Sequence, residues 1–176
     1  MSAALAIQAP QLRVPDFTPE HRLVLDFETF WDVDFTLRKM TTIDYIMDPR
    51  FEVIGVSVFD GEELIWFEHH EFEAWARTVP WHRTSVLAHN TLFDGGVLSY
   101  RYGIHPAILM CTMSMARAYG IDGGVGLENL GEHFGVGKKG DEVEKVKGKR
   151  RRDFTQEEWL RYGEYCKQDT RLCSDI

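Results

Sequence analysis

The stretch "RLVLDFETF", residues 22–30, decides how the rest of the chain is interpreted. It begins as an apolar run that is typical of a buried β-strand. Two carboxylates, Asp26 and Glu28, then interrupt the run one residue apart. Because side chains alternate between the faces of a strand, both carboxylates point to one face, with Cβ atoms roughly 7 Å apart. The alternate apolar positions, from Leu23 to Phe27, point to the other face and are expected to face the core.

Two carboxylates this close repel each other, and their mutual repulsion raises both pKa values. A divalent cation would reverse the sign of that interaction, and oxygen ligands of this kind suit Mg²⁺ or Mn²⁺. The alternative is a strand end that runs into solvent with two ordinary surface acids. The pair alone favours the surface interpretation, so a metal site requires partners elsewhere in the chain.

Two further acids come from elements that are predicted to reach the same core. Asp94 lies in "AHNTLFDGG" (88–96), just inside a helix that follows an apolar strand. Asp169 lies in "YCKQDT" (165–170) on the final helix, four residues after Tyr165 and therefore on the same helical face. Four acids from three elements could line one cleft, although their spacing alone does not bring them together.

The remaining pattern predicts a mixed sheet with helices packed on it. Asp60-Gly61 between two apolar runs predicts a β-hairpin, and Thr155 with Glu158 predicts a capping box at the start of the last helix. Gly163 inside that helix costs about 1 kcal/mol relative to Ala, which suggests a close approach to the backbone there. The expected strands are 22–28, 51–59, 63–68 and 85–90, and the expected helices are 71–79, 91–103, 110–119, 127–135 and one that begins after Thr155.

Length and composition indicate one globular domain with its own core, since the chain has 176 residues, 44% of them hydrophobic. Residues 1–20 lack the basic region of a signal peptide and are expected to form a flexible tail before a functional domain at 21–176. No apolar run is long enough for a membrane span, so no membrane partner is expected. An odd cysteine count without a CxxC pair favours reduced thiols and a cytoplasmic protein.

The formal net charge of −8 argues against holding nucleic acid by bulk positive charge. The segment 138–152 is an exception, because it holds eight Lys or Arg and only three Asp or Glu. It is either a solvated surface loop or a place where a polyanion is met. One hypothesis is that Arg150, Arg151 and Arg152 touch a nucleic-acid backbone.

Taken together, the motifs resemble those of the DEDD superfamily of 3′–5′ exonucleases. "DFET", "HNTLFD" and "YCKQD" are similar, in order, to its D-x-E on the first strand, N-x-x-x-D at a helix start and Y-x-x-x-D on the last helix. The tyrosine form looks most like the proofreading domain of family A DNA polymerases, especially those of bacteriophages. The sister branch has His in an H-x-x-x-x-D pattern, and Glu164 stands at that position here. The resemblance covers about residues 22–176 and implies a ribonuclease H-like α/β fold, a mixed sheet flanked by helices.

The resemblance also implies roles for individual residues. Four carboxylates would bind metal: Asp26, Glu28, Asp94 and Asp169. Tyr165 would position the attacking water, and the substrate strand would be contacted by Thr29, Phe30 and Asn90. Two divalent ions, Mg²⁺ or Mn²⁺, would support hydrolysis of single-stranded DNA from its 3′ end to nucleoside 5′-monophosphates.

Two other functions stay open at this point. An exoribonuclease of the same superfamily is one, because the motifs do not separate DNA from RNA, a choice that depends on contacts to the 2′-hydroxyl. A non-catalytic nucleic-acid-binding domain of a polymerase is the other. The chain stops seven residues after Asp169 and shows no polymerase motif. It is therefore expected to be either a separately encoded exonuclease or the exonuclease part of a polymerase, with a polymerase domain or subunit as partner. A phage-encoded protein of this kind would act in the cytoplasm of its bacterial host.

Overall fold

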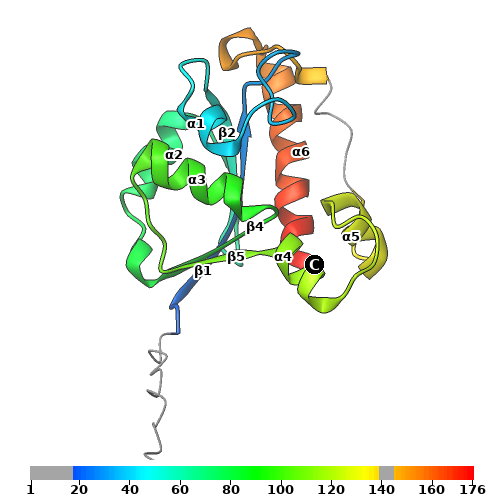
Figure 1. The fold of residues 1–176 in the computed structure, drawn as a ribbon. Helices are drawn as coiled ribbons and strands as arrows, with labels where there is room; N and C mark the ends of the chain where they lie inside the picture. Colours follow the sequence, from blue (N-terminus) through cyan, green and yellow to red (C-terminus); the bar gives the residue numbers. More distant parts are fainter. Residues whose placement is uncertain (1–17, 139–144) are drawn as a thin grey trace, which may run out of the picture.

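A computed structural model of the chain describes residues 18–138 and 145–176 (Figure 1). The predicted tail lies almost wholly outside the described residues, and so does part of the basic segment 138–152. The described part contains a five-stranded sheet with the order β3-β2-β1-β4-β5. Its strands are β1 (His21–Thr29), β2 (Val53–Phe59), β3 (Leu64–Phe67), β4 (Thr84–Ala88) and β5 (Ile108–Cys111).

The sheet is mixed, as predicted. β1 is its central strand, antiparallel to β2 and parallel to β4, and β4 is parallel to β5. Six helices accompany the sheet in the described residues: α1 (Thr42–Met47), α2 (His69–Ala76), α3 (Thr91–Tyr102), α4 (Thr112–Tyr119), α5 (Leu127–Phe134) and α6 (Gln156–Asp175). α1, α2 and α3 lie on one side of the sheet, and α6 runs along the other (Figure 1).

The two faces of β1 pack against different helices, which confirms the predicted alternation. The Phe27 ring contacts Phe72 of α2 and Tyr102 of α3, with ring centroids 5.3 and 5.8 Å apart. Val24, on the other face, belongs to an apolar cluster with Leu172 of α6. The face that carries Asp26 and Glu28 is therefore the face that α6 covers.

Gly163 lies where α6 meets the sheet, and the predicted close approach to its backbone is confirmed. A Cβ at Gly163 would overlap the indole of Trp66 in β3, and a Cβ at Gly55 in β2 would overlap the same indole. The Trp66 ring also lies 4.9 Å from that of Trp159. Both glycines therefore make room for one tryptophan that joins α6 to the sheet, and Gly163 serves packing.

Other local predictions are also confirmed. Asp60 and Gly61 form the turn of the β2–β3 hairpin, with Gly61 at a φ of +105°. Thr155 and Glu158 make the predicted capping box at the start of α6. The cysteines Cys111, Cys166 and Cys173 are free thiols.

Two elements were not predicted from the sequence, α1 and β5. Met110 and Cys111 were expected in a helix, but they end β5. α1 has six residues and β5 has four, and segments this short carry too few periods to be distinguished from loops. Within residues 18–138 and 145–176, none of the helices combines the length and the apolar character that a membrane span needs.

Candidate active site

Asp94, in the first turn of α3, is tied directly to the strand that carries the other motif acids. Its Oδ1 accepts a hydrogen bond from the backbone N–H of Phe27 at 3.1 Å. Because Phe27 stands between Asp26 and Glu28, this bond brings three of the predicted carboxylates to one end of β1. That end lies beyond the paired part of the parallel strands β1 and β4, where open α/β sheets place their ligand sites.

α6 brings the fourth acid, Asp169, to the same end of β1. The hydroxyl of Tyr162, about two turns before Asp169 on α6, donates a hydrogen bond to Glu28 Oε2 at 2.5 Å. Burial raises the pKa of the Cys166 thiol, and three carboxylate charges raise it further: those of Glu28, Asp26 and Asp169. These three acids therefore lie around one buried side chain of α6.

The environment of Asp94 disfavours its charge. Its side chain is 1% exposed, and burial raises its pKa to about 8, with the charge of Glu28 adding to the effect. The hydrogen bond from Phe27 opposes the shift without cancelling it. Asp94 is therefore largely protonated at neutral pH, and a nearby cation would favour the ionised form.

Tyr165 is a hydrogen-bond donor in this environment. Burial raises the pKa of its phenol, and the charges of Asp169 and Glu28 raise it further. A phenol with a raised pKa keeps its proton at neutral pH and cannot serve as a general base. Its available role is to orient a neighbouring acceptor, as the sequence predicts for it.

Tyr162 is a site residue that the sequence motifs do not include. Its ring does belong to the core, and it stacks on the ring of Tyr165 at 6.0 Å. Its hydroxyl nevertheless reaches Glu28. The three-residue spacing from Tyr165, which places both tyrosines on one helical face, was the signal that could have identified it.

The donor set fits a hard divalent cation by chemical type. It consists of carboxylates from three elements, the ligands that Mg²⁺ and Mn²⁺ prefer. In the described residues, 18–138 and 145–176, no group of three or more His, Cys, Asp or Glu is arranged to hold a metal ion as it stands. Binding of a cation by Asp94 would require its carboxyl group to lose its proton.

Asn90 stands between β4 and α3 in a conformation that few residues adopt. It is the N-cap of α3, with φ 65° and ψ 53°, and the only residue other than glycine with positive φ in the part of the chain that the structure describes. Asn tolerates this left-handed region better than most residues. Its side chain makes no capping hydrogen bond, so the amide remains available to a ligand, as the motif resemblance implies.

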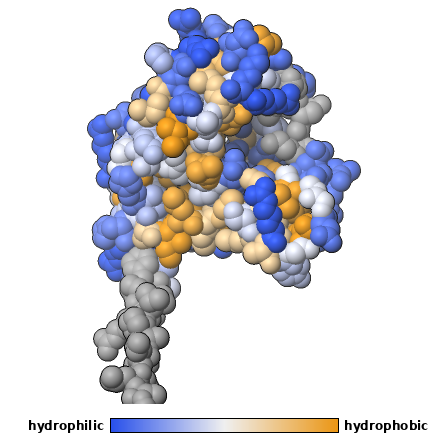
Figure 2. All heavy atoms as spheres, viewed as in Figure 1, coloured by the Kyte–Doolittle hydropathy of each residue, from blue (hydrophilic) through white to orange (hydrophobic). Residues whose placement is uncertain are grey.

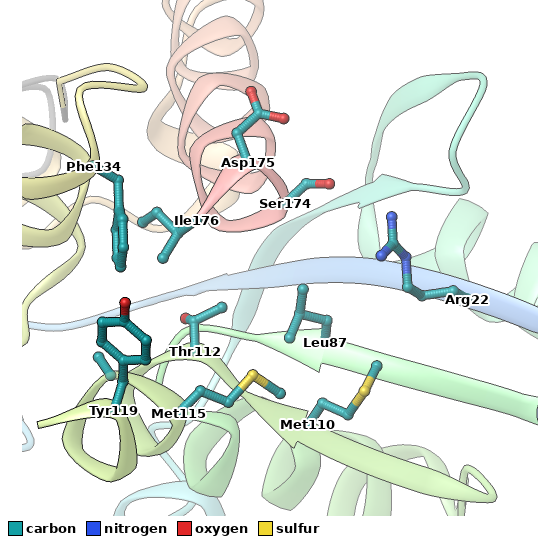
Figure 3. Close-up of a pocket in the computed structure, with 11 residues that line it drawn as sticks. Arg22, Leu87, Met110, Thr112, Met115, Tyr119, Phe134, Ser174, Asp175 and Ile176 are labelled. Carbon is teal, nitrogen blue, oxygen red and sulfur yellow. The ribbon is translucent and has the colours of Figure 1, made fainter.

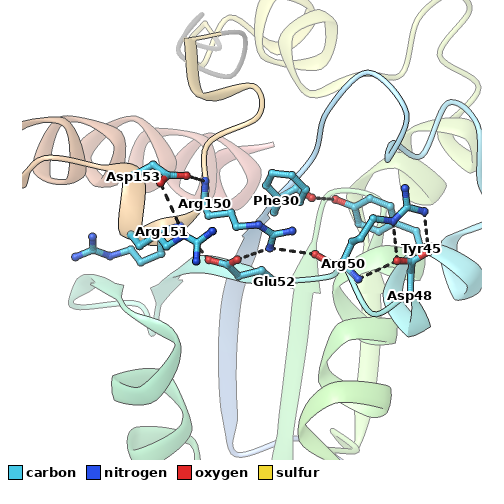
Figure 4. Close-up of polar contacts among 9 residues, drawn as sticks. Phe30, Tyr45, Asp48, Arg50, Glu52, Arg150, Arg151 and Asp153 are labelled. Carbon is cyan, nitrogen blue, oxygen red and sulfur yellow. Dashed lines mark hydrogen bonds and ion pairs between the residues drawn. The ribbon is translucent and has the colours of Figure 1, made fainter.

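Thr29 and Phe30, the other predicted substrate contacts, are engaged with the protein. The hydroxyl of Tyr45 donates to the carbonyl of Phe30 at 2.5 Å, and Thr29 Oγ1 lies 2.9 Å from the same hydroxyl (Figure 4). The Phe30 ring is 6% exposed, and the guanidinium of Arg150 lies 3.9 Å from its centroid. A nucleobase could stack on this face of Phe30 only after Arg150 moved.

Arg150 and Arg151 do not behave as the free cations that the sequence suggested. Arg150 pairs with Glu52 at 2.5 Å (Figure 4). Arg151 pairs with Glu68, and its guanidinium lies over the ring of Trp159, 3.9 Å from the centroid. In the unbound protein these two arginines hold their segment on the body of the protein, and a contact with a nucleic-acid backbone stays a prediction. The side chain of Arg152, the third member, is 81% exposed.

A cavity of about 600 Å³ lies at the far end of α6, and none of the predicted site residues lines it. Tyr119, Phe134 and Ile176 point toward its centre, above Thr112 and Met115 (Figure 3). Its lining is mostly apolar side chains, which gives it no chemistry for hydrolysis. The candidate active site is the carboxylate cluster at the end of β1.

Known proteins resemble this chain in structure. A scan against protein-family models and a search of curated proteins both found no match. Escherichia coli RNase D, described as an exoribonuclease involved in structured RNA processing, has a TM-score of 0.63 at 18% identity, over 88% of this chain and 37% of its own. The Trypanosoma brucei RNase D–GMP complex has a TM-score of 0.63 at 12% identity, over 87% and 48%. Brucella melitensis NrnC bound to pGG has a TM-score of 0.57 at 14% identity, over 87% and 70%.

These likenesses confirm the predicted ribonuclease H-like fold, a mixed sheet flanked by helices. Sequence identities of 12% to 18% support a shared fold and nothing about function. The chain spans 37% of the length of the E. coli protein and 48% of the trypanosomal one, so their activities and substrates are not transferred as findings. The three structures are RNases D and NrnC, and the resemblance to a polymerase proofreading domain stays a prediction.

Proposed function

We propose that this chain is a metal-dependent 3′–5′ exonuclease that removes nucleotides from single-stranded nucleic acid. The observation that carries the proposal is the hydrogen bond between the Phe27 N–H and Asp94. It joins the second motif of the sequence to the first, at a position between the two carboxylates of β1. The Tyr162–Glu28 bond adds the helix of the third motif to the same place.

RNA is the substrate that we place first. RNase D of E. coli is described as an exoribonuclease and resembles this chain in fold. DNA is the second candidate, supported by the tyrosine form of the third motif, which resembles that of polymerase proofreading domains. With DNA as substrate, the chain would act in replication beside a polymerase domain or subunit.

Asp26, Glu28, Asp94 and Asp169 would hold two divalent cations, Mg²⁺ or Mn²⁺. When bound, such ions activate water and stabilise the charge on the leaving oxygen of a phosphodiester. In the reaction, a water oxygen forms a bond to phosphorus and the bond to the 3′ oxygen breaks. The products are a nucleoside 5′-monophosphate and a strand that is one nucleotide shorter, with a new 3′-hydroxyl.

The residues of this chain have separate tasks in that reaction. Tyr165 keeps its proton and donates a hydrogen bond that orients the attacking water. Tyr162 fixes the rotamer of Glu28. Asn90, whose amide is not used as a helix cap, contacts the substrate strand. Binding and orientation of this kind supply a large share of the rate in phosphoryl transfer.

The direct test is degradation of 5′-labelled 12-nucleotide RNA and DNA of matched sequence, with Mg²⁺ or Mn²⁺. The parent is expected to produce a ladder of single-nucleotide steps from the 3′ end, faster on RNA. Asp94→Asn and Asp169→Asn should abolish the ladder, whereas Glu62→Gln, which changes an exposed acid of the β2–β3 turn, should not. If the parent binds both oligonucleotides and cleaves neither, the proposed nuclease activity is refuted. The remaining alternative would then be a non-catalytic nucleic-acid-binding domain.

A further inference from the structure

A groove of about 470 Å³ lies directly after β1, outside the carboxylate cluster. Its walls combine an aromatic ring, two apolar side chains and three cations with one hydroxyl and one carboxylate: Trp31, Val33, Leu37, Arg38, Lys39, Lys147, Thr36 and Asp32. The Asp32 carboxylate accepts hydrogen bonds from the backbone N–H groups of Asp34 and Phe35. Val33 and Leu37 are 62% and 43% exposed, so the apolar part of the groove is open to solvent. The surrounding end of the molecule is mostly hydrophilic (Figure 2).

The charges of this groove are only partly neutralised by the protein. Lys39 pairs with Asp34 at 2.9 Å on the surface. Arg38 and Lys147 have no ion pair with any residue in 18–138 or 145–176. In a chain with a net charge of −8, two cations that no described residue pairs with, beside one ring, provide a local attraction for an anion. They contrast with Arg150, whose charge is met by Glu52.

The groove is held close to the candidate active site. Trp31 follows Glu28 by three residues, which limits the distance between their Cα atoms to about 10 Å. The Trp31 carbonyl accepts a hydrogen bond from the N–H of Gly148 at 2.9 Å, and this bond keeps Lys147 beside the ring. The Lys147 ammonium lies 5.4 Å from the ring centroid, near the outer limit of a cation–π contact.

We propose that this groove binds one unpaired nucleotide of the substrate strand, next to the nucleotide that is removed. The base stacks on Trp31, and its phosphate is met by Arg38 and Lys147. An aromatic face flanked by cations is the combination that binds single-stranded nucleic acid without sequence preference. The inference rests on the proposed function, and it gives the substrate strand a contact that does not require the ion pairs of Arg150 and Arg151 to break.

The test measures binding of the full chain to 12-mers of oligouridine and of oligothymidine, each labelled with fluorescein at the 5′ end. Fluorescence anisotropy, recorded in EDTA, reports the bound fraction. Without metal there is no cleavage, so binding is measured apart from catalysis. Trp31→Ala should weaken binding about 10-fold, and Trp31→Phe should retain most of it. Arg38→Gln with Lys147→Gln should weaken binding and reduce the slope of log K against log salt by about 1.4.

Arg77→Gln is the matched control, since it removes an exposed cation from the C-cap of α2, away from the groove, and binding should not change. If Trp31→Ala and the double cation variant both keep the affinity and the salt slope of the parent, the groove does not bind the substrate strand. This conclusion would hold even if the parent proves to be a nuclease. A parent that shows this Trp31-dependent binding but no cleavage with Mg²⁺ or Mn²⁺ would support the groove and refute the proposed function. The two oligonucleotides show whether the groove prefers RNA or DNA.

Discussion

The hydroxyl of Tyr162 donates a hydrogen bond to Glu28 Oε2 at 2.5 Å, across the interface between α6 and the central strand of the sheet. Burial and the neighbouring charge of Glu28 raise the pKa of Tyr162, so the phenol keeps the proton that it donates. A group that fixes the orientation of a metal ligand affects metal affinity as much as the ligand set itself does. We therefore treat Tyr162 as a positioning residue for Glu28.

Tyr162→Phe tests this role, because it removes the hydroxyl and keeps the ring that packs in the core. Loss of such an outer partner weakens metal binding about 10-fold or more, so Mn²⁺ affinity should fall by that amount in isothermal titration calorimetry. High Mn²⁺ should restore kcat, since the reacting groups remain.

The control for this variant is Tyr100→Phe, which removes a hydroxyl from an exposed tyrosine of α3. Its metal affinity should match that of the parent. An unchanged or tighter Mn²⁺ affinity in Tyr162→Phe would contradict the positioning role, since it would mean that Tyr162 competes with the ion for Glu28.

Tyr165→Phe should act differently, because Tyr165 is proposed to orient water rather than a ligand. We expect a fall in kcat on the order of 10- to 100-fold, the cost of a poorly oriented nucleophile, with little change in Mn²⁺ affinity. Single-turnover cleavage of labelled RNA measures the rate. Full activity would remove Tyr165 from the proposed mechanism, and so would a loss of metal binding equal to that of Tyr162→Phe.

The raised pKa of Asp94 predicts how stability depends on pH in the absence of metal. The folded-state pKa of about 8 exceeds the ordinary aspartate value of 3.8, so the folded protein holds this proton more tightly than the unfolded chain does. The stabilisation is complete below about pH 4 and is lost as pH rises to about 8. Thermal unfolding in EDTA should show a melting temperature that falls across this range.

Asp94→Asn carries no titrating proton, and it should flatten this dependence between pH 5 and 8. Added Mn²⁺ should raise the melting temperature of the parent most at pH 8, where ionised Asp94 is otherwise unfavourable. Identical pH profiles for the parent and Asp94→Asn in EDTA would contradict the assigned pKa.

Gly163→Ala tests the packing role of the glycine in α6. Ala would gain about 1 kcal/mol in helix propensity, but its Cβ would overlap the Trp66 indole. Overpacking in a core costs about 1–3 kcal/mol, so urea unfolding should show a net loss of stability.

The double variant Gly163→Ala with Trp66→Leu is the control, since the smaller side chain leaves room for the new methyl group. The loss caused by Gly163→Ala should be smaller in the Trp66→Leu background, because the two sites are in direct contact. If the two changes in unfolding free energy are additive, the destabilisation by Gly163→Ala does not come from its overlap with Trp66.

The sequence predicted those parts of the fold that have a local cause. The alternation in β1, the Asp60-Gly61 turn and the Thr155–Glu158 capping box each depend on neighbouring residues, and each is present. β5 was missed because a four-residue edge strand shows the same apolar run as the first turn of a helix. The period of a pattern cannot be read from so few residues.

The candidate site also has a part that the sequence predicts and a part that it does not. The motif acids were identified because their spacing within each strand or helix indicates which residues share a face. The roles of Arg150 and Tyr162 depend on partners that lie 98 and 134 residues away, Glu52 and Glu28. No spacing in the sequence reports such a pairing, so the sequence indicated neither the ion pair of Arg150 nor the contact of Tyr162 with Glu28.

The central claim is that four acids from β1, α3 and α6 form one divalent-cation site. Anomalous diffraction from crystals grown with Mn²⁺ tests it most directly, since the signal locates the metal without reference to activity. The account predicts Mn²⁺ peaks within coordination distance of Asp26, Glu28, Asp94 and Asp169, and none there in Asp94→Asn with Asp169→Asn. Fully occupied Mn²⁺ at other residues, with these four carboxylates empty, would contradict it.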